Sequence, residues 1–225
     1  MIRLRGVWHR YTSRGRWVLR GADFTVSPGE AVLVVGPNGS GKTTLLKIAG
    51  LLLEPSRGLV EAWGEPFWSL PRSGRLRLRR RVVYVHEKPI LVRGTVLENI
   101  ALGLLLRGAP RGEALEAARE AAEALGIPGS LLGERARRLS RGLQQLVAVA
   151  RALAVKPRVL ILDEPFAHLD YRRRRLLAEK LEELRDHGTG VAVASHDTGL
   201  AARLADRVVA VEDGGVRPLE TPAGG

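Results

Sequence analysis

A glycine-rich segment between an apolar run and a helix-forming run constrains this chain more than any other feature. The segment is Gly36-Pro37-Asn38-Gly39-Ser40-Gly41-Lys42-Thr43, followed by Thr44, and it comes after the apolar run 31–35. Glycines allow a tight turn in which successive N–H groups point inward and hold phosphate oxygens. The spacing predicts that Lys42 contacts the β- and γ-phosphates and that the Thr43 hydroxyl ligates Mg²⁺. We therefore expect a nucleoside triphosphate site at the start of a helix over 42–49.

Length and composition fit one large α/β domain or a core with an inserted subdomain. The 225 residues are 45% hydrophobic, which fills an interior, and they include no cysteine, which excludes disulfides and thiolate metal sites. Apolar runs fall well short of the roughly 18 residues that span a bilayer. No secretory signal follows the first residues, so we expect a cytoplasmic protein.

The chain carries a formal charge of +12, and nearly all of its cations are arginines. The arginines cluster at 72–81 and again at 172–175. Runs of this kind are most often a solvated face, whereas a basic surface also attracts nucleic acid or an anionic membrane. Charge alone leaves these alternatives open.

Apolar runs separated by turn residues predict an alternation of strands and helices. Strands are expected at 2–7, 18–26, 31–35, 59–62, 82–85, 159–162, 191–194 and 207–211, and helices at 42–49, 95–106, 113–125, 143–153 and 171–185. The helix-rich stretch from about 88 to 155 interrupts an α/β alternation that returns the chain to a parallel sheet. The last residues, 222–225, are expected to be disordered.

Carboxylates and a histidine follow two of the buried strands. Asp163 and Glu164 close the run 159–162, and His196 follows the run 191–194. The carboxyl ends of parallel strands lie beside the glycine loop, where α/β proteins bind ligands. There Asp163 can hold Mg²⁺ and Glu164 can orient or deprotonate the attacking water. His196 is suited to contact the phosphate and stabilise charge in the transition state.

The segment Leu139-Ser140-Arg141-Gly142-Leu143-Gln144-Gln145 resembles the signature Leu-Ser-Gly-Gly-Gln of the ATP-binding cassette ATPases of membrane transporters. The resemblance covers almost the whole chain, and other P-loop enzymes lack this signature. In the family, the signature opens a helix whose N-terminus faces the γ-phosphate held by the opposite subunit. The resemblance implies that Ser140 and the Gly142 N–H face ATP bound by a second chain. Serine is also common as the N-cap of a helix, so Ser140 could have that structural role alone.

Other positions match the family by their place in the chain. Tyr11 lies where the family has an aromatic that stacks on adenine. The segment 167–170 resembles the loop that crosses the dimer interface, with Asp170 as its acidic residue. The segment 83–87 resembles a strand that normally ends in glutamine, which contacts Mg²⁺ and couples to the permease. Here Glu87 takes that place, and Thr95 begins a segment like the start of the family's helical subdomain.

Three residues depart from the family pattern. Arg141 replaces a signature glycine and Leu143 replaces its glutamine, which alters the contacts expected with a second subunit. Glu87 can still ligate Mg²⁺, but it cannot donate a hydrogen bond and it adds negative charge near the phosphates. Because Lys42 and the residues at 163, 164 and 196 are all present, we expect hydrolysis to be retained.

The resemblance implies an α/β fold of the P-loop NTPase type. It has a RecA-like core with a mixed sheet, an antiparallel β subdomain and an inserted α-helical subdomain. We expect one domain over 1–225, with the core and β subdomain in 1–87 and 156–225 and the helical signature subdomain in 88–155.

The implied function is an ATP- and Mg²⁺-dependent ATPase subunit that works as a homodimer or with a paired ATPase subunit. It would drive a separate integral membrane permease from the cytoplasmic face. The sequence around 86–96 is similar to oxyanion importers of the tungstate or phosphate type, for which an extracytoplasmic substrate-binding protein would be a further partner. Exporter ATPases stay an alternative, as do soluble cassette ATPases of nucleic acid or of complex assembly. Nucleic acid is the less favoured partner because the arginine clusters lack regularly interleaved aromatics.

Overall fold

A computed structural model describes residues 1–196 and 198–219, and the tail for which we expected disorder lies outside these ranges. Its centre is a six-stranded sheet in the order β10-β9-β3-β8-β7-β6, parallel except for the pairing of β9 with β10. The strands are β3 (Ala31–Val35), β6 (Val82–Val85), β7 (Val159–Asp163), β8 (Gly190–Ala194), β9 (Arg207–Glu212) and β10 (Gly215–Leu219). Every residue of β7 and β8 is buried, as expected for inner strands covered on both faces.

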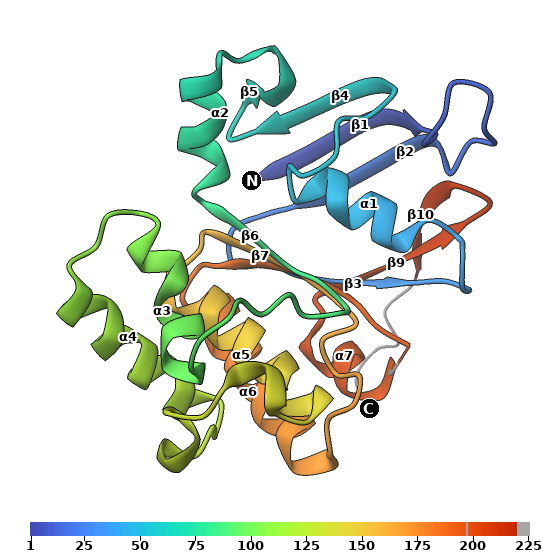
Figure 1. Ribbon diagram of the computed structural model, residues 1–225. Coiled ribbons are helices and arrows are strands. Elements are labelled where there is room, and N and C mark those ends of the chain that lie inside the picture. Colours follow the sequence, from blue (N-terminus) through green and yellow to red (C-terminus); the bar gives the residue numbers. More distant parts are fainter. Residues whose placement is uncertain (197, 220–225) are drawn as a thin grey trace.

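A second sheet lies across one face of the first (Figure 1). It is antiparallel in the order β2-β1-β4-β5, with β1 (Ile2–His9), β2 (Leu19–Val26), β4 (Arg57–Ala62) and β5 (Glu65–Pro66). Helix α1 (Lys42–Ala49) lies between the two sheets. Alternate residues of β1 and β2 are buried against it, so their sequence shows the period of two of a half-covered sheet.

Helices cover the opposite face of the six-stranded sheet (Figure 1). They are α3 (Val96–Leu105), α4 (Arg111–Ala124), α5 (Arg141–Ala154), α6 (Tyr171–Asp186) and α7 (Thr198–Leu204). The side chains of β7 divide between two cores, because Ile161 packs toward α1 while Leu160 and Leu162 pack toward α5 and α6. The sheet therefore holds the glycine loop on one face and the helical layer on the other.

Several elements were not predicted from the sequence. Helix α2 (Arg72–Arg79) buries only Leu78, so it lacks the repeated apolar face that marks a helix in a sequence. Helix α7 was missed, and β10 forms an antiparallel edge strand where we expected only a turn. Three short 3₁₀ turns, at Phe67–Ser69, Gly129–Leu131 and Ala136–Arg138, complete the connections. No helix among the described residues is both long enough and apolar enough to cross a membrane.

A buried polar network joins α3, α5 and the segment that follows β6. Asn99 is fully buried; its amide group bonds the Val92 N–H and carbonyl and the Thr95 carbonyl. The Arg151 guanidinium donates to the Asn99 side-chain oxygen and to the carbonyls of Asn99 and Ile90. Because these buried groups satisfy one another, the network fixes the helical layer against residues 90–92.

We predict that Asn99→Ala lowers the free energy of unfolding by roughly 3 kcal/mol, because it leaves the Val92 N–H and one Arg151 N–H buried without a partner. Urea unfolding followed by circular dichroism measures this loss. Glu120→Ala, at an exposed position of α4, serves as the control and changes stability by less than about 0.5 kcal/mol. Equal midpoints for the two variants would contradict a structural role for the network.

Candidate nucleotide site

The glycine loop connects β3 to α1 in a conformation that depends on glycine. Gly36 has φ +146°, and a Cβ there would lie 2.3 Å from the Val211 carbonyl oxygen, so any side chain would force the loop away from β9. Lys42 is 8% exposed, and its ammonium donates to the carbonyl oxygens of Gly36 (2.7 Å) and Pro37 (3.1 Å). A lysine held by two carbonyls of its own loop retains a third N–H for an anion.

A cavity of about 540 Å³ opens beside this loop at the carboxyl edge of the parallel strands. It brings together most of the residues singled out in the sequence. Its lining consists of Val18, Asn38, Gly39, Gly41, Lys42, Thr43, Thr44, Glu87, Asp163, Glu164, Ala167 and His196. Pro37 and Ser40 line an adjoining cavity of about 470 Å³ on the other side of the loop, together with Trp17.

Two buried oxygens near this loop accept no hydrogen bond from the described residues. They are Ser40 Oγ, within the glycine loop, and Glu164 Oε1, which has an ion-pair contact with His196 Nε2 at 3.3 Å. Buried polar atoms are nearly always hydrogen-bonded in folded proteins, and exceptions point to a ligand or an ordered water. An unsatisfied hydroxyl within the glycine loop fits a nucleotide, and a carboxylate oxygen that accepts no hydrogen bond fits a water molecule.

Glu164 occupies a strained position at the end of β7. Its φ is +50°, which is uncommon for a residue with a side chain, and its N–H donates to the Ala194 carbonyl at the end of β8. The His196 N–H donates to Glu164 Oε2 (3.2 Å), and His196 Nε2 lies 3.3 Å from Glu164 Oε1. Burial raises the pKa of Glu164, an effect that His196 and Lys42 oppose. A carboxylate of increased basicity beside an imidazole can accept a proton from water.

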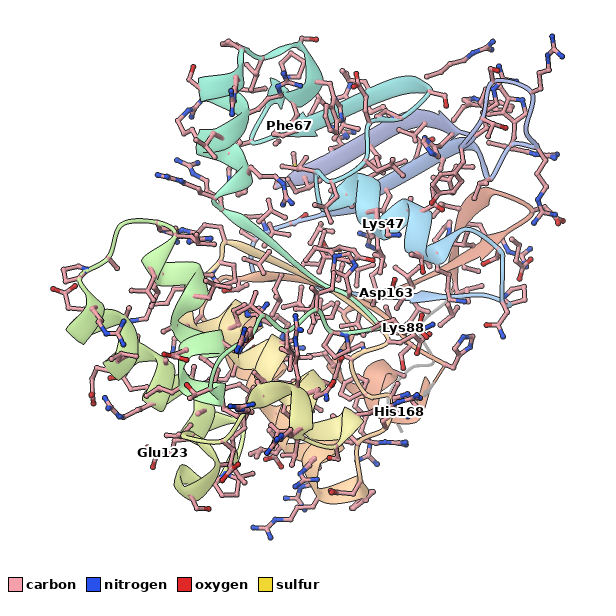
Figure 2. All side chains as sticks on the ribbon, viewed as in Figure 1. Lys47, Phe67, Lys88, Glu123, Asp163 and His168 are labelled. Carbon is pink, nitrogen blue, oxygen red and sulfur yellow. The ribbon has the colours of Figure 1, made fainter. Side chains whose placement is uncertain are left out.

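Asp163 is held by a tyrosine that the sequence analysis gave no role. Tyr84 Oη donates to Asp163 Oδ2 (2.8 Å), and Asp163 is 3% exposed. Tyr84 pairs with Ile161, so it lies on the same face of the sheet as Asp163, two residues further along. Burial, followed by the charge of Asp163, raises the pKa of Tyr84, which therefore stays protonated as a donor. Figure 2 shows Asp163 near the middle of the molecule, below α1 with its labelled Lys47.

Tyr11 lies outside the lining of either cavity. Its side chain is 60% exposed, its hydroxyl is 2.9 Å from Thr44 Oγ1, and its ring meets His9 edge-on. Trp17 is a second aromatic near the loop, and the Arg10 guanidinium covers its ring at 4.6 Å. Stacking of Tyr11 on adenine stays a prediction.

The signature residues and Asp170 do not reach the cavity of their own chain. Ser140 is the N-cap of α5 and accepts a bond from the Leu143 N–H, and Asp170 caps α6 by accepting from the Arg173 N–H. Gly142 is buried against the loop after Glu164, where a Cβ would lie 2.4 Å from the His168 carbonyl oxygen. Ser140 and Asp170 are both exposed, so the two caps are accessible from outside the molecule.

The model of one protein family, described as ABC transporter, matches residues 19–167. The chain belongs to this family. A lipoprotein-releasing system ATP-binding protein (LolD 2) of Caulobacter vibrioides is 42% identical over 88% of this chain and 87% of its own. A phosphate import ATP-binding protein (PstB 2) of Natronomonas pharaonis is 38% identical over 94% of this chain and 76% of its own.

A solved structure extends the likeness to the whole chain. It is a dimeric post-hydrolysis state of an ATP-binding cassette bound to ADP and Pi, with a TM-score of 0.90 and 29% identity over the full length of both chains. The α/β fold of this family, predicted from the sequence, is confirmed. This ABC transporter protein is an ATP-binding ATPase, as expected. The roles of individual residues stay predictions.

We predict that Tyr84→Phe raises the Mg²⁺ concentration for half-maximal ATP hydrolysis by roughly tenfold, because Asp163 loses the bond that orients its carboxylate. Steady-state ATPase rates over a Mg²⁺ titration measure the shift. Tyr171→Phe removes an exposed hydroxyl on α6 and serves as the matched control. An unchanged Mg²⁺ dependence in Tyr84→Phe, with both variants folded, would contradict this positioning role.

Proposed function

We propose that this chain is the ATPase subunit of an oxyanion importer, acting as a dimer on a separate membrane permease at the cytoplasmic face. The observation that carries the proposal is the arrangement of the cavity. Lys42, Glu164 and His196 line it together, while Ser140 is exposed elsewhere on the chain. The site holds phosphate-binding and proton-accepting groups, and a second chain would supply the rest.

In the proposed site, each group has one role. The loop amides and Lys42 bind the phosphates, and Thr43, Glu87 and Asp163 would hold Mg²⁺, which neutralises charge on the phosphate oxygens. One hydroxyl and two carboxylates suit this ion, because Mg²⁺ usually binds through one or two carboxylates plus substrate phosphates and water.

Glu164 and His196 would act on the water and the γ-phosphate. Glu164 accepts the proton from the attacking water, and its raised pKa favours that transfer. His196 lies within 3.3 Å of Glu164 and can donate to the developing charge of the transferred phosphoryl group.

A head-to-tail dimer would bring the exposed signature to the cavity of the partner. The N-terminus of α5 offers the Ser140 hydroxyl, the Gly142 N–H and the positive end of a 14-residue helix. Asp170 would lie at the same interface. ATP bridges two chains through its γ-phosphate and ADP cannot, so closure of the dimer would follow from this difference in binding.

The departures from the family pattern fall on the proposed interface and metal site. Arg141 is exposed at the first turn of α5 and adds a cation facing the partner, while Leu143 is half-buried. Glu87 lines the cavity and adds a second carboxylate to the Mg²⁺ site. The helical segment 88–155, which we propose as a subdomain distinct from 1–87 and 156–225, carries the signature toward the partner.

Transport of an oxyanion is favoured by similarity to the phosphate import protein. The lipoprotein-releasing relative favours a second candidate, an ATPase that drives extrusion of a lipid-linked substrate. The permease determines the cargo in either case. A gene for an extracytoplasmic binding protein beside this one would favour import.

We predict that Glu164→Gln slows ATP hydrolysis by roughly 10²–10⁴-fold while ATP binding is retained, because the amide cannot accept the proton from water. In the presence of ATP and Mg²⁺ the variant should elute as a dimer in size-exclusion chromatography with light scattering.

Glu179→Gln, which changes an exposed carboxylate on α6, controls for the loss of charge and should turn over at the wild-type rate. If the Glu164→Gln protein stayed monomeric and hydrolysed ATP at the wild-type rate, both the role of Glu164 as proton acceptor and the ATP-dependent dimer would be wrong.

A further inference from the structure

Four of the six arginines in 72–81 form two contrasting pairs in the structure. Arg77 forms an ion pair with Glu65, and the largely buried Arg79 guanidinium donates to the Gly50 carbonyl at the end of α1. Arg80 and Arg81 follow α2, and both are exposed. The first two arginines make contacts within the fold, whereas Arg80 and Arg81 have no ion-pair partner among the described residues.

Strand pairing places a second basic segment beside this exposed pair. Val82 of β6 pairs with Val159 of β7, and the N–H groups of Arg158 and Val159 both donate to the Arg81 carbonyl. Arg81 and Arg158 therefore immediately precede two neighbouring strands, and Lys156 lies two residues before Arg158. All of them lie at the amino edge of the sheet, where the chain passes from α2 into β6 (Figure 1).

These cations surround a cavity of about 490 Å³. Its lining is Pro28, Trp63, Arg80, Arg81, Lys156, Arg158 and Gly188, with four cationic side chains and no carboxylate. None of the four cations forms an ion pair within the part of the chain that the structure describes. Arg80 also lies near the partly buried Arg107, where its charge together with burial lowers the Arg107 pKa. Like charges repel one another, and a bound anion would relieve that repulsion.

The shape and chemistry of this cavity select among anions. One guanidinium group can donate two parallel hydrogen bonds to a phosphate. Several cations around one cavity favour a ligand that carries several negative charges. The Arg81 guanidinium lies over the Trp63 ring at 5.3 Å, so the one aromatic face in the cavity is covered. Single-stranded nucleic acid binds along grooves with open aromatic faces, which makes a small ligand the better fit.

We propose that the cavity at the amino edge binds a small anion carrying several phosphate groups, at a site separate from the ATP cavity. The ATP cavity lies at the carboxyl ends of β7 and β8, whereas Arg158 precedes β7 and Gly188 precedes β8. The two sites therefore lie at opposite edges of one sheet. The phosphates would belong to a soluble compound or to a lipid headgroup, since both present the same oxygens.

Isothermal titration of the full-length chain with inorganic tripolyphosphate tests the proposal, with saturating ADP and no divalent cation so that the ATP cavity is filled. We expect one equivalent to bind, with affinity that falls as salt rises. The double variant Arg81→Ala/Arg158→Ala should bind at least about tenfold more weakly. Arg111→Ala/Arg203→Ala removes the same charge from exposed positions on α4 and α7 and should bind as the wild type does.

Arg81→Lys/Arg158→Lys keeps the charge but loses paired hydrogen bonding, so it should show an intermediate affinity even where the alanine variant fails to fold. Sedimentation with vesicles containing a phosphorylated inositol lipid distinguishes a lipid headgroup from a soluble compound as the source of the phosphates. Vesicle binding lost in the alanine variant assigns the phosphates to a headgroup and supports the site. The proposal would be overturned if neither tripolyphosphate nor the vesicles bound. It would also be overturned if both alanine variants lost affinity equally, or if a single-stranded oligonucleotide bound the same arginines more tightly.

Discussion

The parallel hydrogen-bond ladder from β3 through β8 and β7 to β6 is the constraint on which the site depends. The register brings the strand ends to one edge: Asp163 pairs with Ala194, and Val85 pairs with Leu162, one residue before the end of β7. The proposed site residues lie at or just after those strand ends. They are the glycine loop, Glu87, Asp163, Glu164 and His196. A slip of one residue in β7 would turn Asp163 to the opposite face of the sheet, away from Tyr84 and the phosphate loop.

The sheet also explains which features could be predicted from the sequence and which could not. The bounds of β3, β6 and α1 are the predicted ones, because uninterrupted apolar runs and a glycine loop mark them locally. The phosphate loop was predictable for the same reason. The hydrogen bond from Tyr84 to Asp163 was not, because it joins residues 79 positions apart and exists only in one strand register. Likewise, the amino-edge cavity unites five chain segments, none of which has an informative motif of its own.

Contacts between the signature helix and the loop after Glu164 join two parts of the proposed interface within one chain. Gly142 packs on the His168 carbonyl, and His168 itself has φ +62°, so the backbone here tolerates little change. Arg174 Nε also donates to the Leu169 carbonyl and holds this loop to α6. Arg141 and Leu143 depart from the family signature, yet the close contact at Gly142 is retained, and with it the position of the exposed Ser140 cap.

The central claim is that the carboxyl-edge cavity of one chain and the signature of another together hold ATP. A crystal structure of the Glu164→Gln protein with ATP and Mg²⁺ tests it most directly. We expect a dimer in which the γ-phosphate contacts Lys42 of one chain and Ser140 of the other. ATP bound outside the cavity, or bound within it with no residue of a second chain near the γ-phosphate, would contradict it.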